Sequence, residues 1–236
     1  TLWGQARLGL QWLLFRSGPL AIGINQGGCF MKALPEAERP DIQFHVGTLS
    51  ADMAGGKPHP WSGFTLSVCQ LRPESRGRVQ ISSTDPLQAP SMLANYLSTD
   101  LDRRTAVAAV RAARSIASTP AMQPYVKREI KPGPDVRDDD DAALLEYCRN
   151  NGATIFHPSG TCKMGSDPLA VVDTRLRVHG IDRLRVVDCS VMPTLVSGNT
   201  NAPVVAIAEK AADLILADAR GSVAEATPRP VPALHA

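Results

Sequence analysis

The sequence carries almost no net charge and contains no long hydrophobic run. Lysine and arginine together number 25, aspartate and glutamate 23, and the two signs are mixed along the chain. Because a nucleic-acid-binding surface is strongly basic, this composition predicts no nucleic-acid partner. No apolar run approaches the roughly 20 residues of a membrane-spanning helix. Association with a membrane by other means stays open.

Cysteine is also scarce, and it lacks the spacing of a disulfide framework or a zinc site. The cysteines are odd in number, scattered and without a C-x-x-C pair, which favours free thiols in a reducing compartment and therefore a cytoplasmic location. His157 and Cys162 have a spacing that could ligate a metal, but no second pair accompanies them, so we expect no metal site. The five cysteines are Cys29, Cys69, Cys148, Cys162 and Cys189.

The chain does have enough apolar residues for a substantial core. Its 236 residues, 44% of them hydrophobic, allow one or two domains. Apolar residues at helical spacing predict a helix over 2–15 and another that begins at Thr99, with Asp102 three residues later. The acidic run 138–141 is interpreted as the first turn of a third helix that continues through Tyr147, because carboxylates are favourable at that helix end. We expect no metal-binding role for it.

Alternating apolar and polar residues predict half-buried strands in the middle of the chain. One strand is expected around residues 42–46, with Ile42 and Phe44 inward. Two more are expected around 64–68 and 79–81, on either side of a turn, and they are interpreted as an antiparallel hairpin. The sheet indicates either a substrate-binding wall or simply an α+β core.

The last third of the chain predicts a strand, a loop and a helix in that order. The apolar run 184–187 is expected to form a strand ended by Asp188. A Ser-, Pro-, Gly- and Asn-rich loop follows, and Asn201 is the expected N-cap of a helix that holds Pro203 in its first turn. Since ligands of α/β sheets lie at the carboxyl ends of strands, Asp188 could accept hydrogen bonds from sugar-like hydroxyls. Alternatively, it only caps the turn.

A second candidate site residue is His157, which follows the apolar pair Ile155 and Phe156 and precedes Pro158. The proline favours an extended residue before it, so His157 is expected where a strand gives way to a loop. An isolated histidine of this kind can be purely structural. Its loop, however, is rich in glycine and small residues, which lets the backbone approach a ligand closely, and imidazole titrates near neutral pH.

Six motifs in order resemble the C-terminal part of the glucose–methanol–choline (GMC) oxidoreductases, with the choline-dehydrogenase-like branch nearest. Several motifs in the right order are more specific than any one alone. Shorter similarities upstream, at 15–20, 75–79, 85–86 and 95–98, extend the resemblance over most of residues 1–218. The six motifs are HPSGTCKMG at 157–165, AVVD at 170–173, RVHG at 177–180, LRVVDCSVMP at 184–193, GNTNAP at 198–203 and AEKAAD at 208–213.

The resemblance implies a fold of the class α/β plus α+β. Residues 1–153 would form mainly the substrate-binding domain, an antiparallel sheet with helices, with 1–30 as possible contacts with the FAD domain. Residues 154–218 would form the C-terminal part of the FAD domain, with the catalytic loop, a return strand and a helix. Residues 219–236, a tail rich in Ala, Pro, Ser and Thr, are expected to be disordered.

The resemblance also implies an activity, the FAD-dependent oxidation of an alcohol to an aldehyde or ketone. His157 matches the family's catalytic base, and Asn199 matches the second catalytic position, which is His or Asn among members. Residues that match positions flanking the flavin are Asp188, Cys189, Asn201, Ala202 and Pro203. The substrate would be a small-molecule alcohol.

A flavoprotein of this type should carry a strand, a G-x-G-x-x-G turn and a helix for the ADP part of FAD, and no such motif occurs. Gly23, Gly27 and Gly28 have the wrong spacing. We therefore expect the chain to act with an N-terminal FAD-binding half, separate, cleaved or missing, and to expose apolar surface where that half would pack. A different class, a hydrolase using Ser159 or Ser197 with His157, is disfavoured because no G-x-S-x-G motif occurs.

Overall fold

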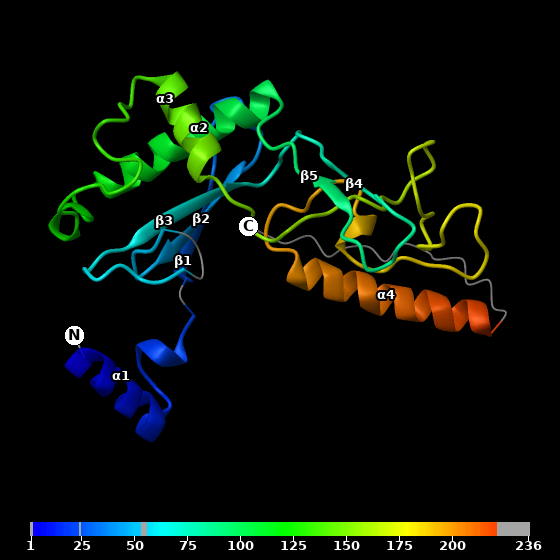
Figure 1. Ribbon diagram of the computed structural model, residues 1–236, viewed down its shortest axis with the longest axis horizontal. Coiled ribbons are helices and arrows are strands. Elements are labelled where there is room, and N and C mark those ends of the chain that lie inside the picture. Colours follow the sequence, from blue (N-terminus) through cyan, green and yellow to red (C-terminus); the bar gives the residue numbers. More distant parts are fainter. Residues whose placement is uncertain (1, 24, 53–55, 221–236) are drawn as a thin grey trace. The chain divides into compact units, whose positions relative to one another are not determined.

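The computed structural model describes residues 2–23, 25–52 and 56–220, and its ribbon is shown in Figure 1. The chain divides into two compact units, Thr1–Phe156 and His157–Ala236. This division lies three residues beyond the domain boundary expected after residue 153. The assignment of the two parts to substrate and FAD domains stays a prediction.

A three-stranded antiparallel sheet lies at the centre of the first unit, with β2 between β1 and β3. The two expected strands are confirmed as β2 and β3, whereas β1 was not expected because Gly27 and Gly28 weaken its strand pattern. The half-buried alternation expected of β2 is wrong, since Gln43 is buried between Ile42 and Phe44. As the central strand, β2 has neighbouring strands on both sides. The bounds are β1 Asn25–Met31, β2 Ile42–Gly47 and β3 Thr65–Gln70.

Helix α2 (Asp100–Ala117) covers one face of this sheet, as Figure 1 shows. Ala109 packs against Ile42 and Phe44, and small side chains along the same helix face let the backbone of α2 approach the strands. A second row of α2 residues packs against Leu144 of α3 (Asp141–Asn151). Both predicted helices form, but the acidic run 138–141 is not the first turn of α3, because Asp140 is the N-cap and only Asp141 lies in the first turn. A short 3-10 turn, η2 (Gln123–Tyr125), lies between the two helices.

The carboxylate of Asp102, in the first turn of α2, makes contacts that the sequence did not predict. Thr99 Oγ1 accepts a hydrogen bond from the Asp102 amide at 3.3 Å, as the predicted helix start requires. The Asp102 carboxylate does not turn back to the start of its own helix, as it would in a capping box. Instead it accepts hydrogen bonds from the backbone amides of Glu74 (2.9 Å) and Ser75 (2.8 Å). This buried side chain therefore fixes the turn that follows β3.

The pairing expected between the second and third predicted strands is wrong. Strand β4 (Arg78–Gln80) pairs antiparallel with β5 (Ser91–Leu93), not with β3. Gly77 brings the two segments together, because a Cβ at this position would lie only 2.2 Å from the carbonyl oxygen of Leu93. The alternating pattern at 79–81 identified a strand but could not identify its partner.

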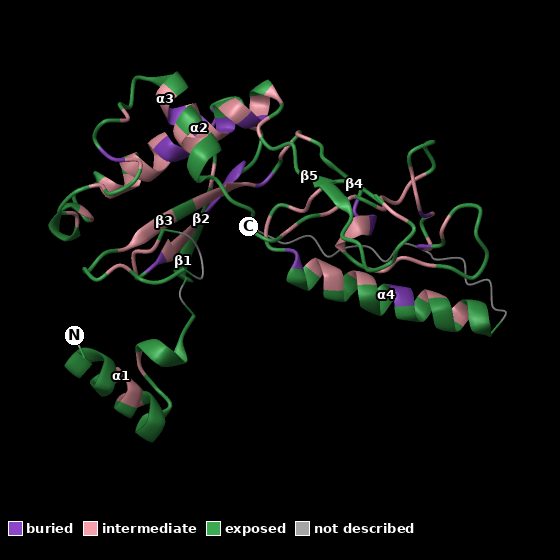
Figure 2. Cartoon of the chain, in the orientation of Figure 1, coloured by how far each residue is buried: buried purple, intermediate pink, exposed green. Residues whose placement is uncertain are grey.

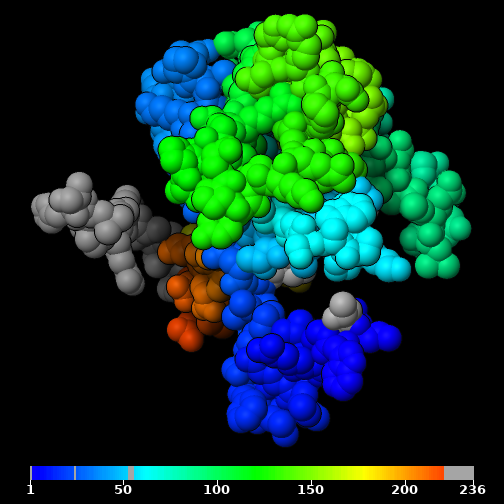
Figure 3. Space-filling model, turned by 90° about the vertical axis from the view of Figure 1, so that its left-hand side faces the viewer, coloured from blue at the N-terminus to red at the C-terminus, as the bar shows by residue number. Residues whose placement is uncertain are grey.

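Helix α1 (Leu2–Phe15) exposes much of its apolar surface. None of its residues is buried, and Trp3 is 88% exposed. The helix has the predicted bounds, and the 3-10 turn η1 (Pro19–Ala21) follows it. Figure 2 shows α1 coloured almost entirely as exposed, and the blue atoms in Figure 3 show the same helix as a surface. Within the described residues, no helix combines the length and apolar character needed to cross a bilayer.

The second unit has its own small core, beneath α4 (Asn201–Ala219). Ala211 of α4 packs with Val172, Leu176 and Val191, and partly buried residues such as Met164 surround them. The 3-10 turn η3 (Cys189–Val191) supplies Val191. Most of α4 outside this row is exposed (Figure 2).

The strand expected at 184–187 does not form. Only one isolated bridge, between Arg177 and Arg185, and two backbone hydrogen bonds beside it remain. The reason lies in the neighbouring backbone, since Leu176 and Arg183 have φ angles of 62° and 61°. Such left-handed residues interrupt an extended ladder. The mixed α and β content of the predicted fold class is confirmed, but its return strand is not.

The carboxyl end of α4 is held by an ion-pair cluster. Asp218 accepts hydrogen bonds from Arg175 and Arg185, and Arg185 also donates to the carbonyl oxygen of Arg175 at 3.2 Å. Burial opposes ionisation of Asp218, but the two guanidinium groups outweigh it and lower the pKa of Asp218 below its ordinary value. Of the expected tail 219–236, Ala219 lies in α4, and 221–236 lie outside the described residues.

Candidate active site

The structure brings His157 and Asn199, 42 residues apart in the sequence, into direct contact. The side-chain amide nitrogen of Asn199 lies 3.0 Å from Nε2 of His157. On the other side of the ring, Nδ1 of His157 lies 2.8 Å from Oγ1 of Thr200. His157 is half-buried, Asn199 is exposed and Thr200 is buried. The ring therefore has its buried neighbour at Nδ1 and its exposed neighbour at Nε2. All three residues belong to the second unit.

The loop that carries His157 is fixed along its length by η3. The amides of Gly160, Cys162 and Met164 donate to the carbonyl oxygens of Cys189, Ser190 and Val191, at 3.4, 3.0 and 2.8 Å. Gly160 has a φ of 83°, which favours glycine at this bend. These bonds place the histidine loop beside the segment that leads to Asn199.

The strand expected before His157 is absent. Ile155 has no strand conformation, and Phe156 has a φ of 62°, outside the extended region. The amide of Phe156 donates instead to the hydroxyl of Thr154 at 3.0 Å, a local turn that competes with strand formation. His157 therefore follows a turn rather than a strand.

Thr200 is a site residue that the sequence analysis missed. It is 6% exposed and occupies the N-cap of α4, the position predicted for Asn201, so the expectation for Asn201 is wrong by one residue. The sequence did contain a signal for this role, because Thr200 directly follows the predicted catalytic residue Asn199. A threonine before a helix, however, usually indicates a cap and not an imidazole partner.

The five residues expected beside the flavin lie on η3 and on the first turn of α4. Asp188 is the N-cap of η3 and accepts a hydrogen bond from the Ser190 amide at 2.7 Å. It therefore caps a turn, as the simpler interpretation expected, and a contact with hydroxyl groups stays a prediction. Asp188, Asn201 and Ala202 are exposed, whereas Cys189 and Pro203 are half-buried.

These residues suit an electron-rich, hydrogen-bond-accepting group such as a flavin. No side chain caps the start of α4, and helix N-termini present backbone N–H donors and a partial positive charge to such a group. The exposed carboxylate of Asp188, the N-cap of η3, lies in the same unit and could accept hydrogen bonds from hydroxyl groups of such a cofactor. The chemistry of this donor set is compatible with FAD, and its contacts with the cofactor stay a prediction.

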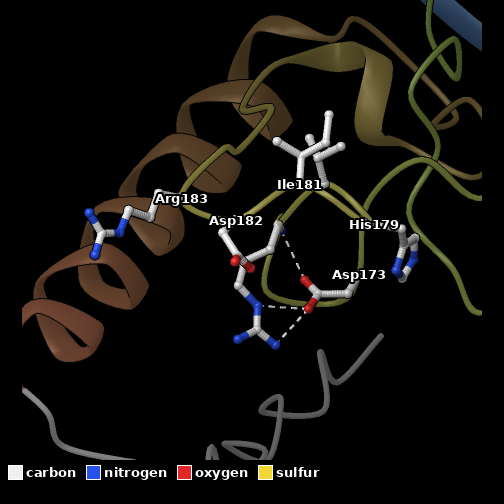
Figure 4. Close-up of a pocket in the computed structure, with 8 residues that line it drawn as sticks. Asp173, His179, Ile181, Asp182 and Arg183 are labelled. Carbon is white, nitrogen blue, oxygen red and sulfur yellow. Dashed lines mark hydrogen bonds and ion pairs between the residues drawn. The ribbon is translucent and has the colours of Figure 1, made fainter.

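A separate depression of about 230 Å³ is formed by the 173–183 loop (Figure 4). None of the predicted site residues lines it. Arg177 donates to Asp173 there; burial opposes ionisation of this carboxyl, but the hydrogen bonds from Arg177 and Arg175 lower the pKa of Asp173 below its ordinary value. His179 Nε2 lies 3.1 Å from the carbonyl oxygen of Gly165. The loop's charged groups are thus largely used to hold its own shape.

Two alternative chemistries find no support in these contacts. Residues 2–23, 25–52 and 56–220 contain no group of three His, Cys, Asp or Glu side chains that could hold a metal ion. A serine hydrolase would need a serine on the ring of His157. The two ring nitrogens of His157 instead lie against Asn199 and Thr200.

Comparison with known proteins agrees with the motifs. The GMC oxidoreductase family model matches residues 73–208. The chain belongs to the GMC oxidoreductase family. It is 44% identical over 201 residues to an alcohol dehydrogenase [acceptor] of Pseudomonas putida, a match that covers 85% of this chain and 36% of the relative. It is 43% identical over 213 residues to an oxygen-dependent choline dehydrogenase of Pseudomonas aeruginosa, covering 90% of this chain and 38% of the relative.

The fold of this GMC chain is also similar to that of solved structures. A formate oxidase of Aspergillus oryzae, whose structure concerns modification of its FAD, has a TM-score of 0.79 and 25% identity. The match covers 92% of this chain and 42% of that one. The resemblance to the GMC oxidoreductases, and to their alcohol- and choline-dehydrogenase members, is confirmed. The chain spans little more than a third of the length of the curated relatives named above.

Proposed function

We propose that the GMC protein containing this chain oxidises an alcohol to an aldehyde or ketone by hydride transfer to FAD. The observation that carries the proposal is the contact between His157 Nε2 and the Asn199 amide at 3.0 Å, made by residues 42 positions apart. A base and a neutral donor side by side are the groups that alcohol oxidation requires. The names of the relatives support an alcohol as substrate.

His157 is the proton acceptor in this proposal. On binding, the alcohol oxygen would displace the Asn199 amide from Nε2, so that its O–H donates to Nε2 and its lone pairs accept from the Asn199 amide. As the carbinol hydride leaves, the O–H proton passes to Nε2, so that the carbon–oxygen double bond can form. An imidazole suits this transfer because its ordinary pKa lies near neutral pH.

Asn199 would stabilise the negative charge that builds up on the substrate oxygen. Its side-chain NH₂ donates a hydrogen bond and does not titrate, so it remains a donor at every working pH. Such a donor contributes most when charge develops in the transition state. The exposed position of Asn199 beside the half-buried ring is compatible with access by a substrate.

FAD, when bound, supplies the hydride acceptor. The start of α4 and the residues around η3 are the proposed contacts of this chain with it, through Asp188, Cys189, Asn201, Ala202 and Pro203. Because the sequence contains no G-x-G-x-x-G motif, we also propose that the ADP part of FAD is bound by an N-terminal half. The chain alone should then elute from gel filtration without FAD. A stoichiometric yellow complex of residues 1–236 would contradict this part of the proposal.

The decisive experiment is anaerobic stopped-flow reduction of the flavin by alcohols in the FAD-loaded protein. His157→Ala should slow reduction by roughly 10²–10⁴-fold while FAD stays bound. His179→Ala is the matched control, since His179 lies in the same unit and contacts Gly165, not Asn199 or Thr200. Unchanged reduction in His157→Ala would remove His157 from the mechanism.

The same assay separates the role of Asn199. Asn199→Ala should raise the barrier to flavin reduction by roughly 2–4 kcal/mol, with the loss in kcat and in kcat/KM alike. If only KM rises, Asn199 positions the substrate and does not stabilise the developing alkoxide.

A further inference from the structure

Thr200 does not do what its place in the helix predicts. As the N-cap of α4 it would normally use its hydroxyl to accept the N–H of the second or third helical residue. The third residue is Pro203, which has no N–H, and Thr200 itself has helical angles, φ −88° and ψ −12°, not the extended angles usual at a cap. No cap hydrogen bond from the Thr200 side chain forms. The Thr200 hydroxyl therefore does not cap α4.

The Thr200 hydroxyl contacts the ring of His157 instead. Thr200 Oγ1 is 2.8 Å from Nδ1 of His157, and Thr200 is only 6% exposed. Because Thr200 is shielded from water, water competes weakly for its hydroxyl, and the short contact helps to hold the half-buried ring. The side of the ring opposite Asn199 is thus fixed.

We infer that Thr200 is a positioning residue that accepts a hydrogen bond from Nδ1–H of His157 and, together with Asn199, stabilises the tautomer with an unprotonated Nε2, an inference that rests on the proposed function. The Asn199 amide nitrogen is only a donor, so its contact at 3.0 Å requires a lone pair on Nε2. A neutral imidazole has one N–H, which then lies on Nδ1 and donates to Thr200 Oγ1. The nitrogen that faces the substrate position is therefore left as the base.

In this arrangement only Nε2 of His157 changes its protonation during the reaction. The alcohol O–H bond breaks and an N–H bond forms at Nε2, while Nδ1 keeps its proton throughout. The Nδ1–H···Oγ1 hydrogen bond becomes stronger once the ring is cationic, because charge-assisted hydrogen bonds exceed neutral ones. Since a hydroxyl carries no charge, Thr200 orients the ring without holding an extra proton on it. A carboxylate at this position would favour the protonated ring before substrate arrives.

The test compares Thr200→Val, which keeps the shape and removes the hydroxyl, with Thr200→Ser, which restores the hydroxyl. The readout is the ¹⁵N NMR spectrum of the histidine rings in the full FAD-loaded protein, with His157 assigned by its loss in His157→Gln. Wild type and Thr200→Ser should show a protonated Nδ1 and an unprotonated Nε2 at neutral ring charge. Thr200→Val removes the acceptor of Nδ1–H and leaves only Asn199 to favour this tautomer, so Nε2–H should become detectably populated.

Flavin reduction provides the second readout. Thr200→Val should slow reduction by roughly 10-fold, as expected for the loss of one well-placed hydrogen bond, with KM little changed. Thr200→Ser should recover most of the rate. Thr161→Val is the control, because Thr161 is an exposed threonine of the histidine loop, and it should change neither readout. Thermal melting identifies any variant that fails to fold, and Thr200→Ala, which also removes the hydroxyl, then takes the place of Thr200→Val.

A wild-type tautomer spectrum in Thr200→Val would overturn the inference, whatever happens to the rate. A shifted tautomer with an unchanged rate would also overturn it, because the tautomer would then not matter to proton transfer. Failure of the proposed function looks different: His157→Ala itself would reduce the flavin at the normal rate. The two hypotheses can therefore be rejected separately.

Discussion

Replacing Asp102 by alanine should destabilise the first unit strongly. The carboxylate is 1% exposed and accepts two backbone hydrogen bonds, from Glu74 at 2.9 Å and Ser75 at 2.8 Å. Hydrogen bonds to a charged group contribute about 1.5–3 kcal/mol each, so the loss of both predicts a cost of about 3–5 kcal/mol after some relaxation. Stabilities of whole domains are only about 5–15 kcal/mol, so this is a large fraction.

The measurement is urea unfolding at neutral pH, followed by tryptophan fluorescence. All three tryptophans lie before residue 62, so the signal reports on the first unit. Hydrogen exchange should also become faster at the amides of Glu74 and Ser75. Asp100→Ala is the matched control in the same helical turn, where the carboxylate is 76% exposed and pairs with Arg104 at 3.1 Å. Such exposed pairs contribute about 0–1 kcal/mol.

Equal destabilisation by Asp100→Ala and Asp102→Ala would refute the reasoning, since burial and the two amide contacts would then have no particular value. A cost below about 1 kcal/mol for Asp102→Ala would refute it as well, given the magnitude of a charge-assisted hydrogen bond.

Two further predictions concern pH and packing. The guanidinium groups lower the pKa of Asp218 despite its partial burial, so its stabilising contribution is present above the ordinary carboxyl pKa of about 3.9 and is lost as pH falls through the lower folded value. The unfolding free energies of wild type and Asp218→Asn should therefore differ at neutral pH and converge in acid. A pH-independent difference would count against this assignment. Gly77→Ala should lower the free energy of unfolding by about 1–3 kcal/mol, because its Cβ would lie 2.2 Å from a carbonyl oxygen. Gly9→Ala is the control in the same urea-unfolding assay: a Cβ there meets nothing within 4 Å, so this change should be neutral or slightly stabilising.

The sequence predicted elements whose cause is local. Helix α2 follows from Thr99 at its start and from apolar residues at helical spacing, and α3 follows from the acidic run, with Asp140 as its N-cap. The pairing of β4 with β5 could not be predicted, because it depends on the close approach at Gly77 and not on the alternation of either strand. The run 184–187 carried strand-forming residues, yet left-handed residues nearby interrupt the ladder.

The candidate site shows a similar division. The family resemblance identified His157 and Asn199, and the structure places their side chains in contact. Thr200 was not identified, because its role depends on a proline three residues later that removes the N–H it would have capped. Asn201 was assigned to the cap for a different reason, because Asn and Thr have similar preferences there.

The location of His157, Asn199 and Thr200 within a single unit has an evolutionary consequence. A crossover between related genes at the 156/157 junction would transfer all three side chains together, with the 157–164 loop and the η3 bonds that hold it. Chimaeras made at that junction could thus inherit their proton-transfer residues intact from one parent and their three-stranded sheet from the other.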